Sequence, residues 1–287
     1  MNVVVREARA SDRRPLMEFV ARTWGGHDYI PSVWDEWLHD KTGTIFVVEV
    51  DGKQVGMNRV RFLRDGTGWL EGARIRPDFR GKGLASLLGK KSMEYASKFG
   101  ITRFRLTSGS RNKAAHSQVS KMGFKEVGRF SVFKAGGRSK LKTQEGVRRV
   151  SSKEAERTMN LISKSEEFRL ARGVYWDSFV VPSLDRDALA DLIKKGYVFS
   201  TKDSKGNSAI AICGPVKEGN EVWQQMSFLC GKPALCRRLV SHLLQDSGPK
   251  KDEKYVFLPK GSRLSKTVRE IGMKKEFQMV LFEGRLD

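Results

Sequence analysis

Cysteine is scarce in this sequence, and its placement excludes several kinds of protein. The 287 residues contain three cysteines, Cys213, Cys230 and Cys236, all in the second half. An odd and sparse set does not form a disulfide framework, so it indicates reduced thiols in a cytosol. Because only His242 lies near them, we expect buried thiols and no metal site.

Long apolar runs are also missing. No run approaches the roughly 20 residues that a helix needs to span a bilayer. The first residues, MNVVVREARASD, lack the basic start, the apolar run and the small-residue cleavage site of a signal peptide. We therefore expect no membrane partner and a cytoplasmic location.

Acidic residues are few relative to basic ones. Lys and Arg number 54 and Asp and Glu 33, which gives a net charge of +21. Residues 1–140 hold 27 basic and 14 acidic residues, and 141–287 hold 27 and 19, so no basic tail carries the excess. Such a charge attracts anions. Nucleic-acid binding is possible but is not favoured over ordinary solvated charge.

What the sequence does contain, between Trp69 and Ala85, is a strand, a glycine-bearing turn and a helix start in succession. The strand stops at Pro77, and Arg80-Gly81-Lys82-Gly83-Leu84-Ala85 opens a helical pattern. The first N–H groups of a helix lack internal partners, and the helix dipole adds partial positive charge. Glycine lets an anion approach the backbone. The pattern therefore predicts an anion site.

This turn resembles motif A of the GNAT superfamily of acetyl-coenzyme A-dependent N-acetyltransferases. Arg80, Gly83 and Ala85 fill the fixed positions of Arg-x-x-Gly-x-Gly/Ala, with Ile75 and Pro77 at the strand end. The resemblance implies that the turn holds the pyrophosphate of acetyl-coenzyme A. It also implies that the pantetheine arm pairs with the strand, and that the Asn112 helix belongs to the family's Asn-x-x-Ala…Gly-Phe block. The implied cofactor-binding residues are Ala73, Arg74, Ile75, Arg76, Arg80, Gly81, Lys82, Gly83, Leu84, Ala85 and Asn112.

The second half repeats the pattern of the first. Val5-Arg6-x-Ala8-x-x-x-Asp12 reappears as Val147-Arg148-x-Val150-x-x-x-Glu154, at an offset of 142 positions counted on the printed sequence. The fold class that follows is α/β with a mixed sheet, in two tandem GNAT-like domains. We expect a cofactor-binding domain at 1–138, a basic linker at 139–146 and a degenerate domain at 147–287. The second domain keeps only Gly231-Lys232-Pro233 where the turn would lie.

Glu71 is the best candidate for a catalytic base. It lies four residues before Ile75, so alternation places it on the same face as Ala73 and Ile75. A carboxylate among apolar neighbours has a raised pKa, which suits proton transfer from an amine. The alternative is a strand carboxylate paired with Arg59, Arg61 or Arg74.

The loop Trp24 to Pro31 is the candidate acceptor site. By resemblance to the superfamily, this region covers the acceptor amine. Its sequence, with Trp37-Leu38-x-Asp40, is similar to the corresponding stretch of vertebrate histidine N-acetyltransferases and departs from it at His27. The candidate substrate-binding residues are Gly26, His27, Asp28 and Tyr29. A rigid loop in which Tyr29 only packs remains the alternative.

The family's usual tyrosine, four residues before Gly123, is replaced by Val119. The proton donor to the leaving thiolate is thus unassigned, and His116 is favoured as a packing or surface residue. The favoured function is acetyl transfer to the amine of a small molecule, an amino acid above all, by direct attack. Acetylation of a protein lysine or N-terminus and a basic nucleic-acid-binding module on a GNAT scaffold are the alternatives.

Overall fold

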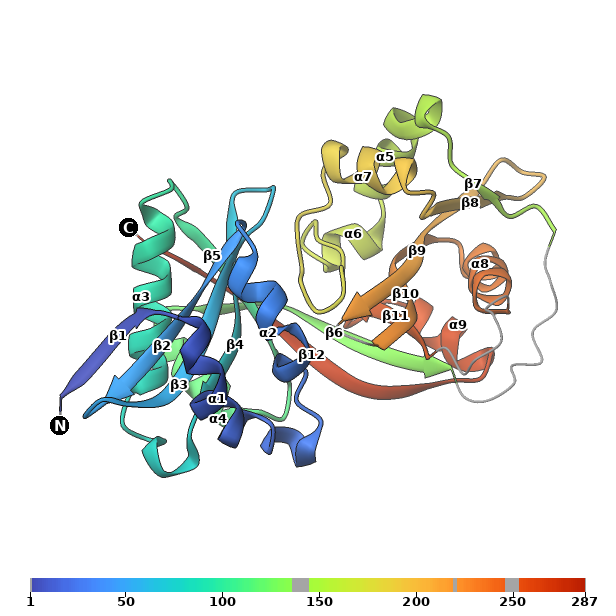
Figure 1. Cartoon of the computed structure of the whole chain (residues 1–287). Helices are drawn as coiled ribbons and strands as arrows, with labels where there is room; N and C mark the ends of the chain where they lie inside the picture. The colour runs from blue at the N-terminus through green and yellow to red at the C-terminus, as the bar shows by residue number, and fades with distance from the viewer. Residues whose placement is uncertain (1, 136–144, 219–220, 246–252, 287) are drawn as a thin grey trace. The chain divides into compact units, whose positions relative to one another are not determined.

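The computed structural model describes residues 2–135, 145–218, 221–245 and 253–286 (Figure 1). These residues form two compact units that are not consecutive in sequence. Unit 1 comprises Met1–Glu126, Glu218–Asn220 and Phe282–Asp287, and unit 2 comprises Val127–Lys217 and Glu221–Leu281. The linker expected at 139–146 lies mostly outside the described residues.

Unit 1 is a mixed sheet with helices on both faces. Its elements are β1 (Val3–Glu7), α1 (Arg13–Val20), α2 (Ile30–His39), β2 (Gly43–Val50), β3 (Lys53–Phe62), β4 (Thr67–Ile75), α3 (Leu84–Ser97), β5 (Arg103–Gly109), α4 (Lys113–Lys121) and the start of β6 (Lys125–Ala135). Strands β1 to β4 pair antiparallel in sequence order, and β4 pairs parallel with β5. The strand, turn and helix predicted between Trp69 and Ala85 are present as β4, residues 76–83 and the start of α3.

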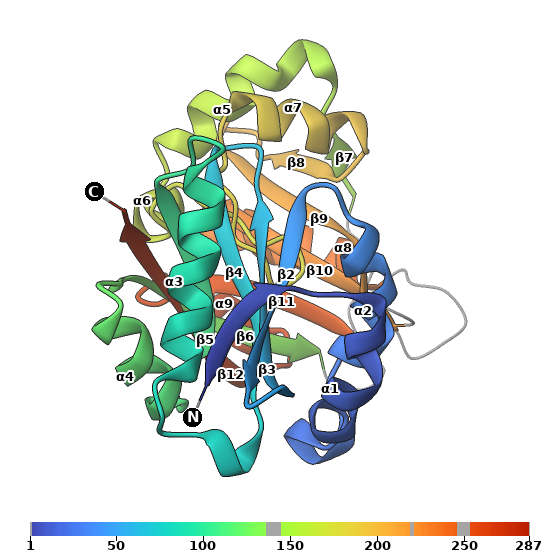
Figure 2. The ribbon, with the colours of Figure 1, turned by 60° about the vertical axis from the view of Figure 1, so that its left-hand side comes forward.

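The core of unit 1 has two layers. Helices α1 and α2 pack on one face of the sheet, where their apolar side chains meet Ile45, Val47 and Met57. Helix α3 packs against β2, β3 and β4 (Figure 2). On this second face, Asn58 Nδ2 of β3 donates a 2.9 Å hydrogen bond to Ser92 Oγ of α3. One face of β3 therefore packs against α1 and α2, and the other face packs against α3.

Unit 2 has the same order of elements after its first helices. It contains β7 (Arg148–Arg149), α5 (Ala155–Ser163), α6 (Glu166–Leu170), α7 (Arg186–Lys194), β8 (Val198–Lys202), β9 (Ser208–Glu218), β10 (Glu221–Gly231), α8 (Pro233–Gln245), β11 (Lys254–Pro259), α9 (Leu264–Glu270) and most of β12 (Met273–Arg285). Strands β10 and β11 pair parallel, as β4 and β5 do in unit 1. The mixed sheet predicted from the sequence is therefore present in both halves.

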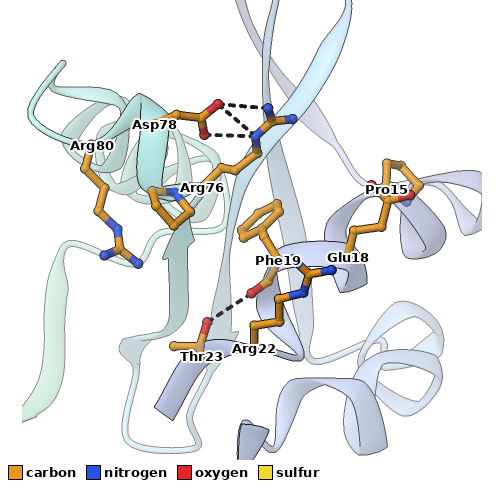
Figure 3. Close-up of a pocket in the computed structure, with 9 residues that line it drawn as sticks. Pro15, Glu18, Phe19, Arg22, Thr23, Arg76, Asp78 and Arg80 are labelled. Carbon is orange, nitrogen blue, oxygen red and sulfur yellow. Dashed lines mark hydrogen bonds and ion pairs between the residues drawn. The ribbon is translucent and has the colours of Figure 1, made fainter. Parts of the chain in front are cut away.

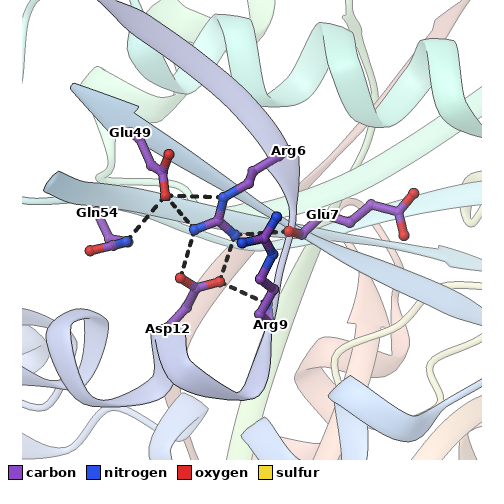
Figure 4. Close-up of polar contacts among 6 residues, drawn as sticks. All are labelled: Arg6, Glu7, Arg9, Asp12, Glu49 and Gln54. Atoms are coloured by element: carbon purple, nitrogen blue, oxygen red, sulfur yellow. Dashed lines mark hydrogen bonds and ion pairs between the residues drawn. The ribbon is translucent and has the colours of Figure 1, made fainter. Parts of the chain in front are cut away.

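Both units open with the same polar arrangement, 142 positions apart. Arg6 of β1 donates to Asp12 Oδ2 at 2.7 Å, and the N–H of Arg9 donates to the same oxygen (Figure 4). Arg148 of β7 likewise donates to Glu154 Oε2 at 2.7 Å, and the N–H of Ser151 joins it at 3.2 Å. Although burial opposes it, the bonds from Arg6 and Arg9 hold the pKa of Asp12 below its usual range. The shared contact supports the repeat that the sequence predicts.

Two long strands exchange partners between the units, which the sequence did not indicate. Residues 130–134 of β6 pair with β11 of unit 2, from Phe130↔Pro259 to Lys134↔Tyr255. The end of β12 belongs to unit 1, where the N–H of Leu286 donates to the carbonyl of Thr102. A boundary at residue 138 therefore differs from the division into compact units, because hydrogen bonding places most of β6 in the second unit.

Candidate active site

The turn between β4 and α3 has the geometry of an anion site. Gly81 and Gly83 have φ values of +77° and +76°, in the left-handed region that glycine adopts without strain. Gly83 is the N-cap of the 14-residue helix α3, and no side chain caps that end. A Cβ built on either glycine would meet nothing within 4 Å. Among the described residues, the N–H groups of Leu84 and Ala85 therefore remain available and the approach to them is open, whereas the N–H of Ser86 donates to the carbonyl of Gly83 at 3.0 Å.

A pocket of about 540 Å³ lies beside this turn (Figure 3). Helix α1 and the residues after it form one wall, and the turn after β4 forms the other. Arg76 donates to Asp78 Oδ2 at 2.8 Å, and these hydrogen bonds lower the pKa of Asp78. The residues that line the pocket are Pro15, Glu18, Phe19, Arg22, Thr23, Arg76, Pro77, Asp78 and Arg80.

Strands β4 and β5 part where the site begins. Their parallel pairing runs from Thr67↔Arg103 to Trp69↔Arg105. Strand β4 continues to Ile75 and β5 to Gly109, yet among the described residues no backbone pairing joins these later parts. The two diverging strands leave main-chain groups that can pair with an extended, amide-bearing arm.

A bulge in β4 fixes which side chains face the acceptor loop. Arg59 lies opposite Glu71 and Met57 lies opposite Arg74, so Gly72 and Ala73 together face one residue of β3. Gly72 takes a φ of +67°, and a Cβ there would come within 2.8 Å of the Trp37 ring. Because Met57 faces α1 and α2, both Glu71 and Arg74 lie on that face.

The bulge corrects one expectation about Glu71. Strict alternation placed Glu71 on the same face as Ala73 and Ile75, but the extra residue at Gly72 shifts the alternation by one position. Glu71 instead shares its face with Arg74, next to the acceptor loop. The single sequence signal for this bulge is the glycine within the strand.

Glu71 is paired and buried at the same time. Its Oε1 accepts a 2.8 Å hydrogen bond from Arg59 Nη1, and Arg59 also pairs with Asp40. Burial raises the pKa of the Glu71 carboxyl above its ordinary value, although the Arg59 and Arg61 charges act to lower it. The ion pair with Arg59 is the alternative foreseen from sequence, and the raised pKa keeps the carboxyl suited to proton transfer. Its role as the base stays a prediction.

The acceptor loop reaches the same face of the sheet. Asp28 is fully buried and accepts a 2.6 Å hydrogen bond from Arg74 Nε and a 3.1 Å bond from the N–H of Ile30. The Arg74 guanidinium lies 5.8 Å from the Tyr29 ring centroid, and Tyr29 packs edge-on against Trp37 at 5.8 Å. The structure thus brings Asp28 and Tyr29 into the cluster that holds Glu71.

Two residues of the cluster had no assigned role in the sequence analysis. The Cζ atom of Arg59 lies 4.8 Å from the centroid of the Trp37 ring. Asp40 Oδ2 accepts a hydrogen bond from Arg59 Nη2. Their spacing on α2 and just after it was visible in the sequence. Their convergence on Arg59 was not, because it depends on how α2 packs on β3.

The remaining candidates are placed as follows. Gly26 has a φ of +92° at the end of a short 3₁₀ helix, and His27 is exposed. Asn112 caps α4, where its Oδ1 accepts from the N–H of Ala115 at 3.1 Å. His116 Nε2 lies 3.1 Å from the carbonyl of Gly109, and its ring contacts Phe282, as expected of a packing histidine. Val119 is buried.

In the part of unit 2 that the structure describes, neither the glycine turn nor the open gap between parallel strands is present. A single residue, Lys232, separates β10 from α8, and Pro233 is the first residue of that helix. Beyond the last β10–β11 pair, Met226↔Val256, the N–H of Trp176 donates to the carbonyl of Ser227. The Trp176 ring stacks on Phe257 at 4.6 Å. The place where these strands part is therefore filled by the chain itself.

Three further observations concern the cysteines, possible metal ligands and membrane spans. All three cysteines are free and buried, and burial raises the pKa of Cys213 and of Cys230 to about 12. Within the described ranges, no group of three or more His, Cys, Asp or Glu side chains is placed to hold a metal ion. No helix among the residues placed by the structure has the length and apolar content for a membrane span.

The chain is similar in sequence to known N-acetyltransferases. The model of the acetyltransferase (GNAT) family matches residues 10–124. A histidine N-acetyltransferase of Oreochromis niloticus is 34% identical over 82 residues, which are 28% of this chain and 24% of that protein. An uncharacterized N-acetyltransferase of Methanocaldococcus jannaschii is 30% identical over 142 residues, covering 42% of this chain and 60% of that protein. The chain thus spans about a quarter of the first relative and three fifths of the second.

Solved structures extend the likeness over both units. A GCN5-related N-acetyltransferase from Sphaerobacter thermophilus has a TM-score of 0.67 at 13% identity, covering 99% of this chain and 95% of that one. Another from Kribbella flavida has a TM-score of 0.53 at 15% identity, covering 100% and 71%. Similarity at such identity shows the fold alone. The sequence match to the acetyltransferase (GNAT) family model thus covers residues 10–124, and the chain as a whole has the fold of two GNAT-like domains.

Proposed function

We propose that this protein transfers an acetyl group from acetyl-coenzyme A to the α-amine of a small molecule, with a free amino acid as the acceptor. One observation carries the proposal. An uncapped helix start, a diverging strand pair and a buried carboxylate, Glu71, lie along the single segment from β4 to α3.

The fit to the cofactor rests on the backbone. The left-handed turn at Gly81 and Gly83 leaves the N–H groups at the start of α3 open to a pyrophosphate. Arg80 and Lys82 add positive charge at the same end. The unpaired edge of β4 beyond Trp69 suits the amides of the pantetheine arm. When bound, acetyl-coenzyme A supplies the activated acetyl group and a thiolate leaving group.

The residues of unit 1 then have distinct roles. Glu71 accepts a proton from the acceptor ammonium, so that the amine nitrogen can form a bond to the acetyl carbon while the carbon–sulfur bond breaks. Arg59 holds the Glu71 carboxyl in place through Oε1. The nitrogen loses a second proton as the amide forms and the thiolate gains one, so these two protons balance. The proton that Glu71 holds then passes to solvent. Residues 1–140 contain no cysteine that could carry the acetyl group, which supports direct attack.

The energetics favour an α-amine over a lysine side chain. At pH 7, removing a proton from a lysine amine with a pKa near 10.4 costs about 4.6 kcal/mol, but only about 1.4 kcal/mol from a peptide α-amine with a pKa near 8. The α-amine of a free amino acid is somewhat more basic than that of a peptide and less basic than the lysine amine, so its cost lies between the two. A single carboxyl with a raised pKa is a base of moderate strength. It is therefore better matched to the α-amine.

A screen of the twenty amino acids for coenzyme A release tests the proposal. We expect turnover with one amino acid or a few related ones. Turnover with none of them, alongside acetylation of lysines in a protein lysate, would contradict it. We also infer a cytoplasmic location, which the three free thiols support.

A further inference from the structure

The inference concerns Arg61, a cation of β3 that the acetyl-transfer scheme above does not use. It lies two residues after Arg59 on the same strand, opposite Trp69 of β4. Residues two apart on a strand share a face, so Arg61 faces the same side of the sheet as Arg59 and Glu71. It is half-buried, and its Nε is fully buried without a hydrogen-bond partner.

The neighbouring Arg59 shows what a satisfied guanidinium looks like in this position. Its two terminal nitrogens hold Glu71 and Asp40. Across residues 2–135, 145–218, 221–245 and 253–286, by contrast, no ion pair or hydrogen bond is found for Arg61, although its charge acts on both Asp40 and Glu71. Asp40 and Glu71 thus offset its charge without accepting a hydrogen bond from it, and a buried N–H without an acceptor is costly, so the arrangement suits an anion supplied from outside.

Glu71 presents the complementary group. Arg59 engages its Oε1, and in the same ranges no partner is found for Oε2. In the register of β3 and β4, Arg61 and Glu71 are diagonal neighbours, with Cα atoms roughly 7–8 Å apart, within reach of long side chains. One face of two adjacent strands thus offers a carboxylate oxygen and a guanidinium side by side.

We propose that Arg61 binds the carboxylate of the acceptor while its amine lies at Glu71, so that the enzyme selects free α-amino acids. A zwitterionic amino acid presents its ammonium to Glu71 and its carboxylate to Arg61, which lie on one face of the sheet. An amine without a carboxylate, or the N-terminus of a peptide, leaves Arg61 unpaired. This proposal rests on the proposed function and names the residue that selects its substrate class.

The first test needs only the wild-type protein. It compares kcat/KM for the best amino acid of the screen with kcat/KM for its amide, which keeps the α-amine and lacks the carboxylate. The α-amine of the amide is less basic, so chemistry alone favours the amide. We expect the amino acid to be preferred by at least about tenfold, as for a charged hydrogen-bond partner. A preference for the amide would overturn the proposal.

The second test uses Arg61→Gln, with Lys53→Gln as its matched control. Lys53 is an exposed cation on the same strand, away from the cluster. Arg61→Gln should lower kcat/KM for the amino acid by about 10- to 100-fold, mainly through KM, and change that of the amide by less than about twofold. Arg61→Lys should recover part of the loss, because it keeps the charge without the planar fork. Lys53→Gln should leave kcat/KM unchanged for both acceptors.

An equal loss on both acceptors would overturn the role of Arg61 and leave acetyl transfer standing. Should Arg61→Gln fail to fold, the wild-type comparison still decides. Absence of turnover with every amino acid would instead overturn the proposed function itself, so the two failures are distinguishable.

Discussion

The parallel strand pairs of the two units start alike and end differently. In unit 1, β4 and β5 pair over three positions and then part. In unit 2, β10 and β11 pair over three positions and then part as well. The first opening lies beside an eight-residue turn, Arg76–Gly83, whereas the second has Trp176 seated in it and one residue, Lys232, before the next helix.

A second element completes the filling in unit 2. Helix α6 contacts both β10 and β11, and its buried Glu167 accepts a 3.3 Å hydrogen bond from Ser262 Oγ. A parallel strand pair that parts after three positions is therefore not sufficient to make the site. A site needs the opening to stay empty and the turn to be long enough to present a helix start.

The largest effect is expected when the turn of unit 1 is disrupted. Arg80→Ala combined with Gly83→Pro takes away a charge and forces a φ near −65° where the turn needs +76°. We expect calorimetry to show at least about a 1,000-fold loss of acetyl-coenzyme A affinity, because several N–H contacts are lost together.

The matched control for that variant lies in unit 2. Lys205→Ala with Gly206→Pro alters a basic residue and a left-handed glycine, φ +78°, in the β8–β9 turn. Affinity should stay at the wild-type value. If the unit 1 variant also keeps its affinity, the assignment of the turn is wrong.

Removal of the Trp176 side chain tests whether it fills the place in unit 2 where β10 and β11 part. Trp176 is 1% exposed, and Trp176→Ala should cost about 3–5 kcal/mol of unfolding free energy, as for a large buried aromatic. Phe179→Ala in the same segment, where the side chain is 39% exposed, should cost far less. Denaturant unfolding measures both. Equal effects would show that Trp176 does not fill the opening.

Glu71→Gln separates the chemistry of unit 1 from its binding. Loss of a general base typically lowers the rate about 100-fold or more. Since burial raises the pKa of Glu71, wild-type activity should fall as the pH drops through that raised value, and this limb should be absent in the variant. Acetyl-coenzyme A affinity should not change. A pH–rate profile identical to wild type would exclude Glu71 as the base.

The smallest expected effect concerns the buried carboxyl of unit 2. Burial raises the pKa of Glu167, so its protonated form is favoured by folding. That stabilisation is complete below the unfolded pKa near 4.3 and is lost as the pH rises through the folded value. Glu167→Gln should therefore stabilise the protein at neutral pH by on the order of 1 kcal/mol, and not below about pH 4. Thermal unfolding at both pH values checks this, and a loss of stability at neutral pH would contradict it.

Local signals in the sequence were sufficient for the elements of unit 1 and for the turn. Periodicity, Gly83 and Pro77 act within a few residues, and the structure confirms the strand, turn and helix that they predict. The repeat was visible as well, because Arg6 and Arg148 recur at a fixed offset with their acidic partners.

Contacts set by packing were not predictable in the same way. The bulge at Gly72 reverses the face of every later residue in β4, and a lone glycine in a strand does not specify it. The pairing of Asp28 with Arg74 joins residues 46 positions apart. The exchange of β6 and β12 depends on which of two strands fits beside β5, and both have the alternating pattern of a strand.

That exchange has a consequence for the order of events during synthesis. The end of β12 belongs to unit 1, and the N–H of Leu286, just after that strand, donates to the carbonyl of Thr102, which lies 184 positions earlier in the chain (286 − 102). Domains commonly fold one by one as the chain leaves the ribosome. Here the sheet of unit 1 lacks a strand until the residues after Leu281 have been synthesised, so unit 1 is completed only after unit 2 has been made.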